Sequence, residues 1–289
     1  MKKTNSLRIG TFAVALLLLL NSCHKNMYSN HHFPDPLAGK NQVAEYHVSL
    51  FDQILPQPLH YLFGKKFDSS GKLTEIICSF DNVQMPSDII PSQLDLHVVD
   101  SGRIIYLLTL DTTGHGATDT TARIYLGSND RPDSCLCNYR LLFNRTAASH
   151  ATGKTFFTYQ VHRLFSVRND NDYNNRFPFS GTDTVRYDHL GNPLSFSQNS
   201  YEYDTTRKVR QQFYCDDYTG NSHSFYLLQY LGYFPEINSP AYVRTKVTRF
   251  FESGSYTLTN HQFDQEGRLT GYNYLGNSFF NFTITWTGN

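Results

Sequence analysis

A short unit recurs along this chain and restricts what it can fold into. The unit is an aromatic residue, Asp, two variable residues, Gly, a basic residue and Leu, and it occupies residues 67–73 and 263–269, while residues 187–194 repeat it with one residue inserted. In a tight turn the Asp side chain accepts backbone hydrogen bonds and the Gly adopts a positive φ. The flanking aromatic and Leu side chains then fall on one face of two adjacent strands. Each copy therefore predicts a β-hairpin, and their recurrence predicts a meander.

Alternation with period two extends this prediction to most of the chain. Residues 243–249 and 280–286 alternate polar and apolar side chains, which is typical of a sheet with one buried face. Phe, Tyr and Trp make up 15% of the residues and favour strands. Residues 203–209 carry a degenerate copy of the unit without its Gly, and residues 225–234 form an apolar run that is either a short helix or a buried strand. We predict a mainly β domain over residues 43–289, a curved antiparallel meander or half-open barrel whose concave face is partly covered by residues 225–234.

The first 23 residues carry an export signal. Basic residues precede a short apolar run, residues 9–20, which ends in Leu20-Asn21-Ser22-Cys23. This arrangement resembles the signal of bacterial lipoproteins, in which the signal is cut before the Cys and the Cys is acylated. The resemblance implies a signal peptide over residues 1–22, a lipid on Cys23, and a flexible tether over residues 23–42. It also implies a location in the cell envelope, which we expect to be the outer membrane on its periplasmic side.

The repeated unit is similar to the YD repeat, and more closely to the YD-like secreted lipoproteins of Bacteroidetes. The passage over residues 225–240, an apolar stretch followed by Asn238-Ser239-Pro240 and a strand, is similar to those proteins as well. The resemblance covers residues 183–289 and the hairpin at 67–77. It implies an all-β envelope protein without an established activity, and it supplies no catalytic residues.

Charge and cysteine content restrict the partners. Without the signal's three basic residues, 22 basic side chains face 25 acidic ones, which argues against a nucleic-acid partner. Four cysteines remain besides Cys23, namely Cys78, Cys135, Cys137 and Cys215. They can form up to two disulfides or stay as buried thiols. A metal or redox site at Cys135 and Cys137 is the other alternative, although zinc pairs usually have a wider spacing and a second pair of ligands.

Three motifs carry further hypotheses. Asp170, Asp172 and Asn174 have the spacing that opens a calcium loop, but Asn175 stands where Gly is needed and Gly181 where the bidentate Glu is needed, so a solvated loop is the alternative. Residues 148–155 fit a relaxed phosphate-loop pattern, but a strand-like stretch follows, so we predict a polar hairpin loop and no cofactor. Four threonines follow Asp and resemble the acceptor motif for O-glycosylation in Bacteroidetes, where turn-to-strand chemistry is the alternative: Thr112, Thr120, Thr184 and Thr205.

No nucleophile, metal-ligand or phosphate motif in a supporting context indicates a reaction. The leading hypothesis is therefore a non-enzymatic binding or scaffold module, held to the bilayer through Cys23, with a glycan or another envelope protein as its partner. A carrier of hydrophobic cargo on an open half-barrel, similar to lipoprotein-sorting proteins, is the second hypothesis. A glycan hydrolase is the third, and it requires two carboxylates roughly 5–10 Å apart in a cleft.

Overall fold

The computed structural model describes ten stretches of the chain, and the account below concerns these: residues 42–51, 59–81, 93–109, 119–138, 152–171, 181–196, 199–214, 223–249, 254–276 and 279–288. Sixteen strands follow one another around a single sheet within them, and each strand pairs antiparallel with the next along the chain. The strands are β1 Val43–Phe51, β2 Leu59–Phe67, β3 Leu73–Asp81, β4 Gln93–Asp100, β5 Ile104–Thr109, β6 Asp119–Leu126, β7 Pro132–Asn138, β8 Thr152–Gln160, β9 Arg163–Asn171, β10 Gly181–Tyr187, β11 Pro193–Phe196, β12 Asn199–Lys208, β13 Tyr242–Arg249, β14 Gly254–Phe263, β15 Leu269–Leu275 and β16 Phe279–Trp286.

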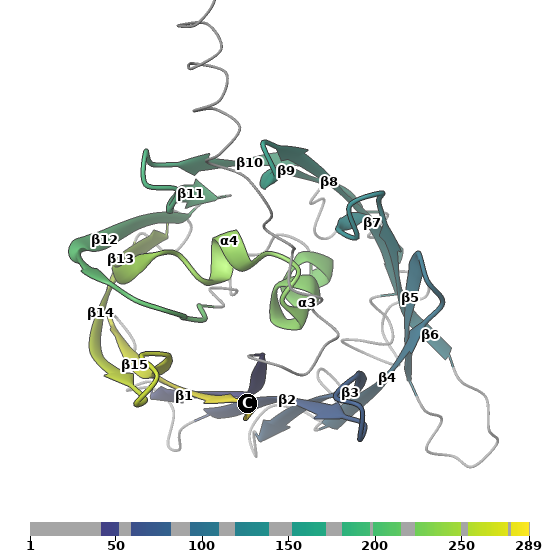
Figure 1. Ribbon diagram of the computed structural model, residues 1–289, viewed down its shortest axis with the longest axis horizontal. Helices are drawn as coiled ribbons and strands as arrows, with labels where there is room; N and C mark the ends of the chain where they lie inside the picture. Colours follow the sequence, from purple (N-terminus) through teal and green to yellow (C-terminus); the bar gives the residue numbers. More distant parts are fainter. Residues whose placement is uncertain are drawn as a thin grey trace, which may run out of the picture. The chain divides into compact units, whose positions relative to one another are not determined.

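The sheet is a closed barrel, because its first and last strands pair (Figure 1). β1 and β16 run antiparallel from Val43 opposite Trp286 to Phe51 opposite Phe279. The expected antiparallel meander is confirmed, but the half-open barrel is wrong. Closure leaves no unpaired edge on β1 or β16, and unpaired edges are a liability that barrels remove.

The three clean copies of the repeated unit form the hairpin turns that the sequence predicts. The Asp side-chain oxygen accepts two backbone N–H groups in each turn, at 2.8–3.0 Å, in Asp68, Asp188 and Asp264. The glycines have φ values of +83°, +89° and +76° at Gly71, Gly191 and Gly267. The degenerate copy is different: Asp204 lies inside β12, opposite Val243, and no hairpin turn forms there. Without the Gly, β12 continues as a strand.

The buried face of the wall points into the barrel. In β16, Phe280, Phe282 and Ile284 are buried, whereas Asn281 and Thr283, between them, are exposed. The same alternation holds in β5, where buried and partly exposed side chains take turns. The inward residues join one apolar and aromatic core cluster that extends around the barrel.

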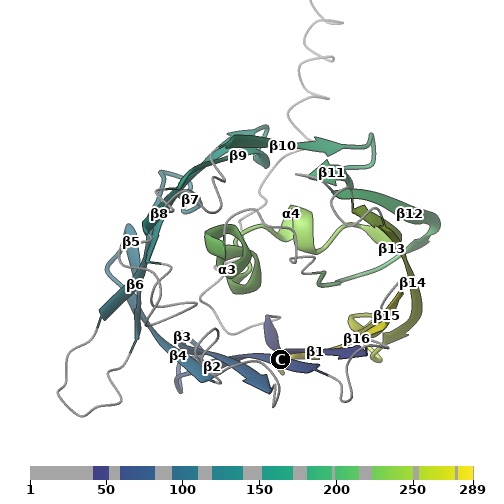
Figure 2. The same ribbon diagram turned by 180° about the vertical axis from the view of Figure 1, so that it is seen from behind.

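The connection between β12 and β13 supplies a segment that fills part of the interior. We call the described residues of this connection, 209–214 and 223–241, the internal segment; it contains α3 His223–Leu231 and α4 Pro235–Asn238. Its rings contact strands from different parts of the wall, with centroid distances of 5.1 Å for Tyr230 and Phe63 of β2, and 5.2 Å for Phe234 and Phe157 of β8. Figures 1 and 2 show α3 and α4 inside the ring of strands. The apolar run at 225–234 is therefore mainly helix α3, and it packs within the barrel.

The short hairpin turns share one end of the barrel. The β2–β3, β10–β11 and β14–β15 turns lie at this end, and so do the start of β1 and the end of β16, because neighbouring strands run antiparallel. There the N–H of Gln42 donates to Thr287 Oγ1 at 3.1 Å, and the N–H of Thr287 donates to the Gln42 carbonyl at 2.9 Å. The described helices include none with the length and apolar character needed to cross a membrane.

Candidate functional site

Buried charged side chains hold the internal segment at several points, and they are the most specific chemistry that the structure describes. Arg131, in the turn between β6 and β7, is 2% exposed. Its guanidinium donates to the Glu236 carboxylate of α4 and to the carbonyl of His162, and it lies 4.0 Å from the ring centroid of Tyr159. The same Glu236 oxygen accepts the backbone N–H of Leu164 at 2.7 Å. This clamp ties α4 to the β6–β7 turn and to β9.

Two tyrosines complete the surroundings of the clamp. Burial raises the pKa of Tyr159 far above its ordinary value, and the charge of Glu236 adds to the effect while the charge of Arg131 opposes it. Burial likewise raises the pKa of Tyr187. Both phenols therefore stay neutral donors at physiological pH: Tyr159 donates to the Pro132 carbonyl at 2.8 Å and Tyr187 to the Leu164 carbonyl at 2.9 Å. The arrangement positions backbone and does not poise either phenol for proton transfer.

Two more buried cations contact the internal segment from other parts of the wall. Lys65 of β2 donates to the carbonyl of Leu231 at 3.3 Å, at the end of α3, where a positive charge is favourable. Arg244 of β13 is fully buried, with its guanidinium 4.2 Å from the ring centroid of Tyr201 and 4.5 Å from that of Tyr214. It also donates to the Ile237 carbonyl at 3.3 Å. The cations thus stabilise the segment through its backbone.

Two of the predicted hairpin turns hold the ends of the internal segment. At its start, Gln211 forms a bridge with Arg268, and its carbonyl accepts the N–H of Leu269 at 2.9 Å. At its end, the N–H of Ala241 donates at 3.1 Å to the side chain of Asn192, which takes the place of the basic residue in the second copy of the unit. The repeated unit therefore does more than turn the chain: two copies of it bracket the internal segment.

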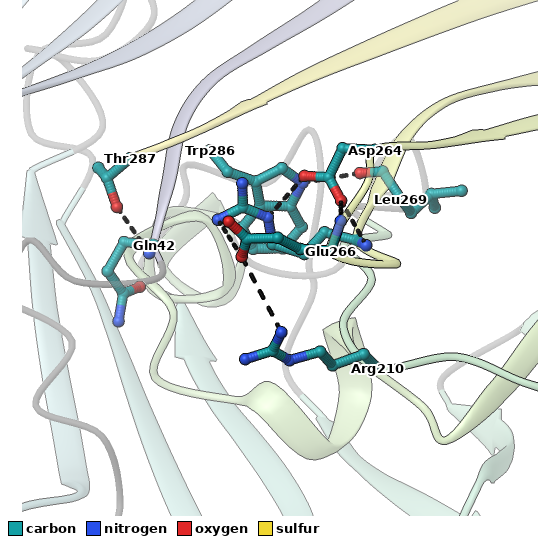
Figure 3. A network of polar contacts seen from close by, with 8 residues as sticks. Gln42, Arg210, Asp264, Glu266, Leu269, Trp286 and Thr287 are labelled. Atoms are coloured by element: carbon teal, nitrogen blue, oxygen red, sulfur yellow. Dashed lines mark hydrogen bonds and ion pairs between the residues drawn. The ribbon is translucent and has the colours of Figure 1, made fainter. Parts of the chain in front are cut away.

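The last hairpin also joins this segment to the final strand (Figure 3). Burial raises the pKa of Asp264, but hydrogen bonds from Arg268 and its charge outweigh burial, so the pKa lies below its ordinary value. Glu266 lies 3.5 Å from Arg268 and 4.0 Å from Arg210 of the internal segment. Trp286 of β16 donates its indole N–H to the Leu269 carbonyl at 2.8 Å. Polar contacts thus join the last hairpin to the internal segment and to β16 at the barrel end where β1 begins.

Among the described residues, neither the calcium-loop nor the phosphate-loop pattern forms an assembled site. Asp170 is exposed in β9 and lies 3.5 Å from Arg168, whereas Asp172 and Asn174 lie outside the described residues. Where the chain is described, no group of three or more His, Cys, Asp or Glu side chains could hold a metal. In the phosphate-loop pattern, Lys154 lies within strand β8 and not at the start of a helix.

The other candidate residues are dispersed. Thr184 is exposed in β10, Thr205 is exposed in β12, and Thr120 is partly exposed in β6. Cys135 and Cys137 are fully buried in β7, where their alternate positions place both on the inward face. Cys78 lies in β3; Cys23, Thr112 and Cys215 fall outside the described residues.

Sequence reasoning missed the residues that hold the internal segment. One signal was present, since period two places Lys65 on the same face of β2 as Phe63 and Phe67, so a charge stands at an inward position. No such pattern marks Arg131 or Glu236, because their pairing spans more than 100 residues and depends on barrel closure.

The outward face of the wall carries charged side chains even at strand centres, together with some exposed apolar ones such as Val99, Phe165 and Leu275. Arg123 is exposed within β6. Lys246 of β13 lies 2.8 Å from Glu202 of β12, and Lys66 of β2 lies 3.0 Å from Glu75 of β3. A transmembrane barrel has the opposite arrangement, with an apolar band outside and a polar interior. The wall of this barrel therefore has the polarity of a protein with an apolar core.

These features define a closed, antiparallel sixteen-stranded barrel with an apolar, partly filled interior. Comparison with family models finds no match, and comparison with curated proteins finds none either. Among solved structures, the chain is similar to a porin-like protein from Bacteroides uniformis ATCC 8492, with a TM-score of 0.56 and 12% sequence identity, over 84% of this chain and 98% of that one. At this identity the similarity shows the fold alone.

Proposed function

We propose that this protein is a lipid-anchored barrel of the cell envelope, tethered through acylated Cys23, whose wall faces water and which acts as a non-enzymatic binding or scaffold module. The observation that carries the proposal is the polarity of the wall. Charged side chains such as Arg123, Lys154 and Lys246 occupy outward positions within strands, beside a few exposed apolar ones, and most inward side chains are aromatic or aliphatic. The porin-like neighbour supports a barrel of the envelope, and its name supports no transport by this chain.

The free-energy cost of placing charged side chains in lipid favours a wall that faces water over a wall that faces the bilayer. An Arg or Lys on the lipid face costs about 2–4 kcal/mol at the bilayer midplane. Arg123, Lys154 and Lys246 are outward within their strands, so a lipid-facing wall would bear several such costs. The interior is equally unsuited to an aqueous channel, because its core side chains are apolar and the internal segment packs among them. Attachment to a membrane then requires a separate anchor, and an acyl chain on Cys23, in its lipoprotein-like signal, would be that anchor.

The buried charges support a structural role over catalysis. Arg131, Glu236, Lys65 and Arg244 each contact or belong to the internal segment, and their described partners are largely backbone carbonyls and aromatic rings. We therefore assign them to holding the segment. The surfaces left for a partner, a glycan or an envelope protein, are the outer wall and the barrel ends.

Cell fractionation of the Cys23→Ser variant tests the proposal. The membranes are washed with about 1 M salt, which reduces the Debye length to roughly 3 Å and removes electrostatic association. We expect the wild type and a Ser22→Ala control, which keeps a small residue before Cys23, to stay with membranes, and Cys23→Ser to become soluble or to remain unprocessed. A processed Cys23→Ser protein that stays in the washed membranes would overturn the proposal.

The apolar inner face favours one alternative, a carrier of hydrophobic cargo. Cargo would compete with the internal segment for the same rings, such as Phe157, whose centroid lies 5.2 Å from that of Phe234. Solvent extraction of the purified Cys23→Ser protein, followed by mass spectrometry, separates the two functions. A stoichiometric apolar molecule in the extract would favour the carrier, and its absence would favour the scaffold.

A further inference from the structure

We propose that one side of the outer wall, built by β5 to β9, docks on an anionic membrane surface. We call this side the basic–aromatic face, defined by Tyr106, Arg123, Tyr125, Lys154, Phe156 and Arg168. The barrel would then lie against the bilayer that holds its lipid anchor. The proposal rests on the proposed function for the tether, but the face itself is argued from the described wall.

Strand register places these residues in two continuous rows. Directly opposite pairs link Tyr106 to Arg123 and, through Leu136 of β7, to Lys154, and the row continues to Asp170 of β9. A second row links Tyr125, through Ser134 of β7, to Phe156 and then to Arg168. All of them alternate with buried inward residues, such as Ile124 in β6 and Phe157 in β8. Rings and cations therefore lie side by side on one outward surface.

At the centre of the face, two cations approach one ring. Lys154 Nζ lies 4.7 Å, and the Arg168 guanidinium 4.3 Å, from the centroid of Phe156. Both cations are exposed, and Phe156 is partly exposed. Phe165, on the same outward side of β9, is 37% exposed. Exposed rings beside cations are typical of surfaces at the membrane interface, where rings enter the headgroup region and cations meet phosphates.

The cations of this face differ from those elsewhere on the wall. Lys66 and Lys246 each have a carboxylate partner, at 3.0 and 2.8 Å. Within the stretches that the structure covers, Arg123 and Lys154 have no carboxylate partner. Arg168 lies 3.5 Å from Asp170, and both side chains are more than half exposed. Asp170 also lies opposite Lys154 in the strand register, so the positive charge of the face is compensated only in part by the wall.

The exposed charges on the described side chains of β5 to β9 give the same sign, by a small margin. The exposed cations are Arg123, Lys154 and Arg168, and the exposed carboxylates are Asp133 and Asp170; Arg186 of the neighbouring β10 adds one further cation. Across the ring, β14, β15, β16 and β1 instead present a row of uncharged side chains, from Thr259 through Asn273 and Asn281 to Ser49 (Figure 2). Charge complementarity therefore favours an anionic partner for this side over the side built by β14, β15, β16 and β1.

The tether permits this orientation. Residues 23–42 span up to about 65 Å when extended, at roughly 3.3 Å per residue, so a barrel held at Cys23 can turn its side to the bilayer. Each Lys or Arg near an anionic surface strengthens binding by about fivefold, so removal of three predicts a loss of about 100-fold.

Vesicle sedimentation tests the proposal with the mature Cys23→Ser chain, which lacks the lipid. The probes are vesicles of phosphatidylcholine alone and of phosphatidylcholine with about a third phosphatidylglycerol, at low and at high salt. The face variant is Arg123→Gln, Lys154→Gln and Arg168→Gln together. The matched control, Lys66→Gln, Lys208→Gln and Lys246→Gln together, makes the same change in net charge away from the face. Circular dichroism verifies that both variants fold.

We expect binding to anionic vesicles only, lost at high salt, reduced about 100-fold in the face variant and much less in the control. Equal losses in the two variants, or no binding by the parent chain, would overturn the proposal. Self-association that the face variant alone abolishes would assign the face to a second copy and would overturn it as well. Retention of Cys23→Ser in salt-washed membranes would instead contradict the proposed tether, so the two failures are distinguishable.

Discussion

Replacement of Glu236 by Ala should destabilise the barrel strongly. The carboxylate pairs with Arg131, whose side chain is 2% exposed while that of Glu236 is 11% exposed. Removal of one partner of a buried pair leaves the other charge uncompensated and typically costs about 3–5 kcal/mol. The Leu164 N–H also loses its acceptor, but the clamp lies at an end of the barrel, where water can replace part of it. We therefore expect a loss of about 3–5 kcal/mol.

Urea unfolding of the mature Cys23→Ser chain, followed by circular dichroism, measures this loss. For a domain of this size it corresponds to a fall in Tm of about 10 °C. Glu266→Ala is the matched control, because Glu266 pairs with two arginines but is about one-third exposed; it should cost less than about 1 kcal/mol. The double variant Glu236→Ala, Arg131→Met should lose less free energy of unfolding than the sum of the losses in the two single variants. A loss below 1 kcal/mol for Glu236→Ala would show that the clamp is not closed in solution.

Three further predictions concern the hairpins and one partly buried histidine, His261. Gly267→Ala should cost about 1–2 kcal/mol by chemical denaturation, because its φ is +76°, whereas Gly181→Ala, in open space, should be nearly neutral; equal effects would contradict the turn geometry. Asp264→Asn should cost about 0.5–1 kcal/mol at pH 7, and the difference should vanish as the pH falls through the lowered pKa of Asp264, since the wild-type carboxyl then also takes up a proton. Burial lowers the pKa of His261, so its contribution to stability is complete above pH 6.5 and is lost as the pH falls below that value. Thermal melts of His261→Gln between pH 7.5 and 5.5 should therefore show a weaker pH dependence than the wild type, and an unchanged dependence would contradict this assignment.

The parts of the fold that the sequence could predict are local. An Asp, a Gly and the flanking apolar residues define a turn within seven or eight positions. The hairpin turns of the three copies that contain the Gly are therefore predicted correctly. The copy around Asp204 shows how much depends on one residue, because without Gly the segment continues as β12. Alternation also predicts which side chains of β16 are buried.

The parts that could not be predicted are non-local. Closure depends on β1 meeting β16, and no local pattern distinguishes two paired edges from two free ones. The apolar run at residues 225–234, most of which forms α3, indicated a buried segment, but it did not indicate that the segment would lie inside a closed barrel. The contact of Arg131 with Glu236 follows only once the barrel has closed and the internal segment lies inside it.

The most direct test of a wall in water is the reaction of an outward cysteine with a membrane-impermeant maleimide. Thr283 is exposed at the middle of β16, and its neighbour Ile284 points inward. Thr283→Cys and Ile284→Cys are compared with the parent protein, which corrects for native thiols, in native membrane fragments before and after addition of detergent. A wall in water predicts that Thr283→Cys reacts rapidly in both conditions and that Ile284→Cys reacts slowly in both. If Thr283→Cys reacts only after detergent has removed the lipid, the wall faces the bilayer and the central claim is wrong.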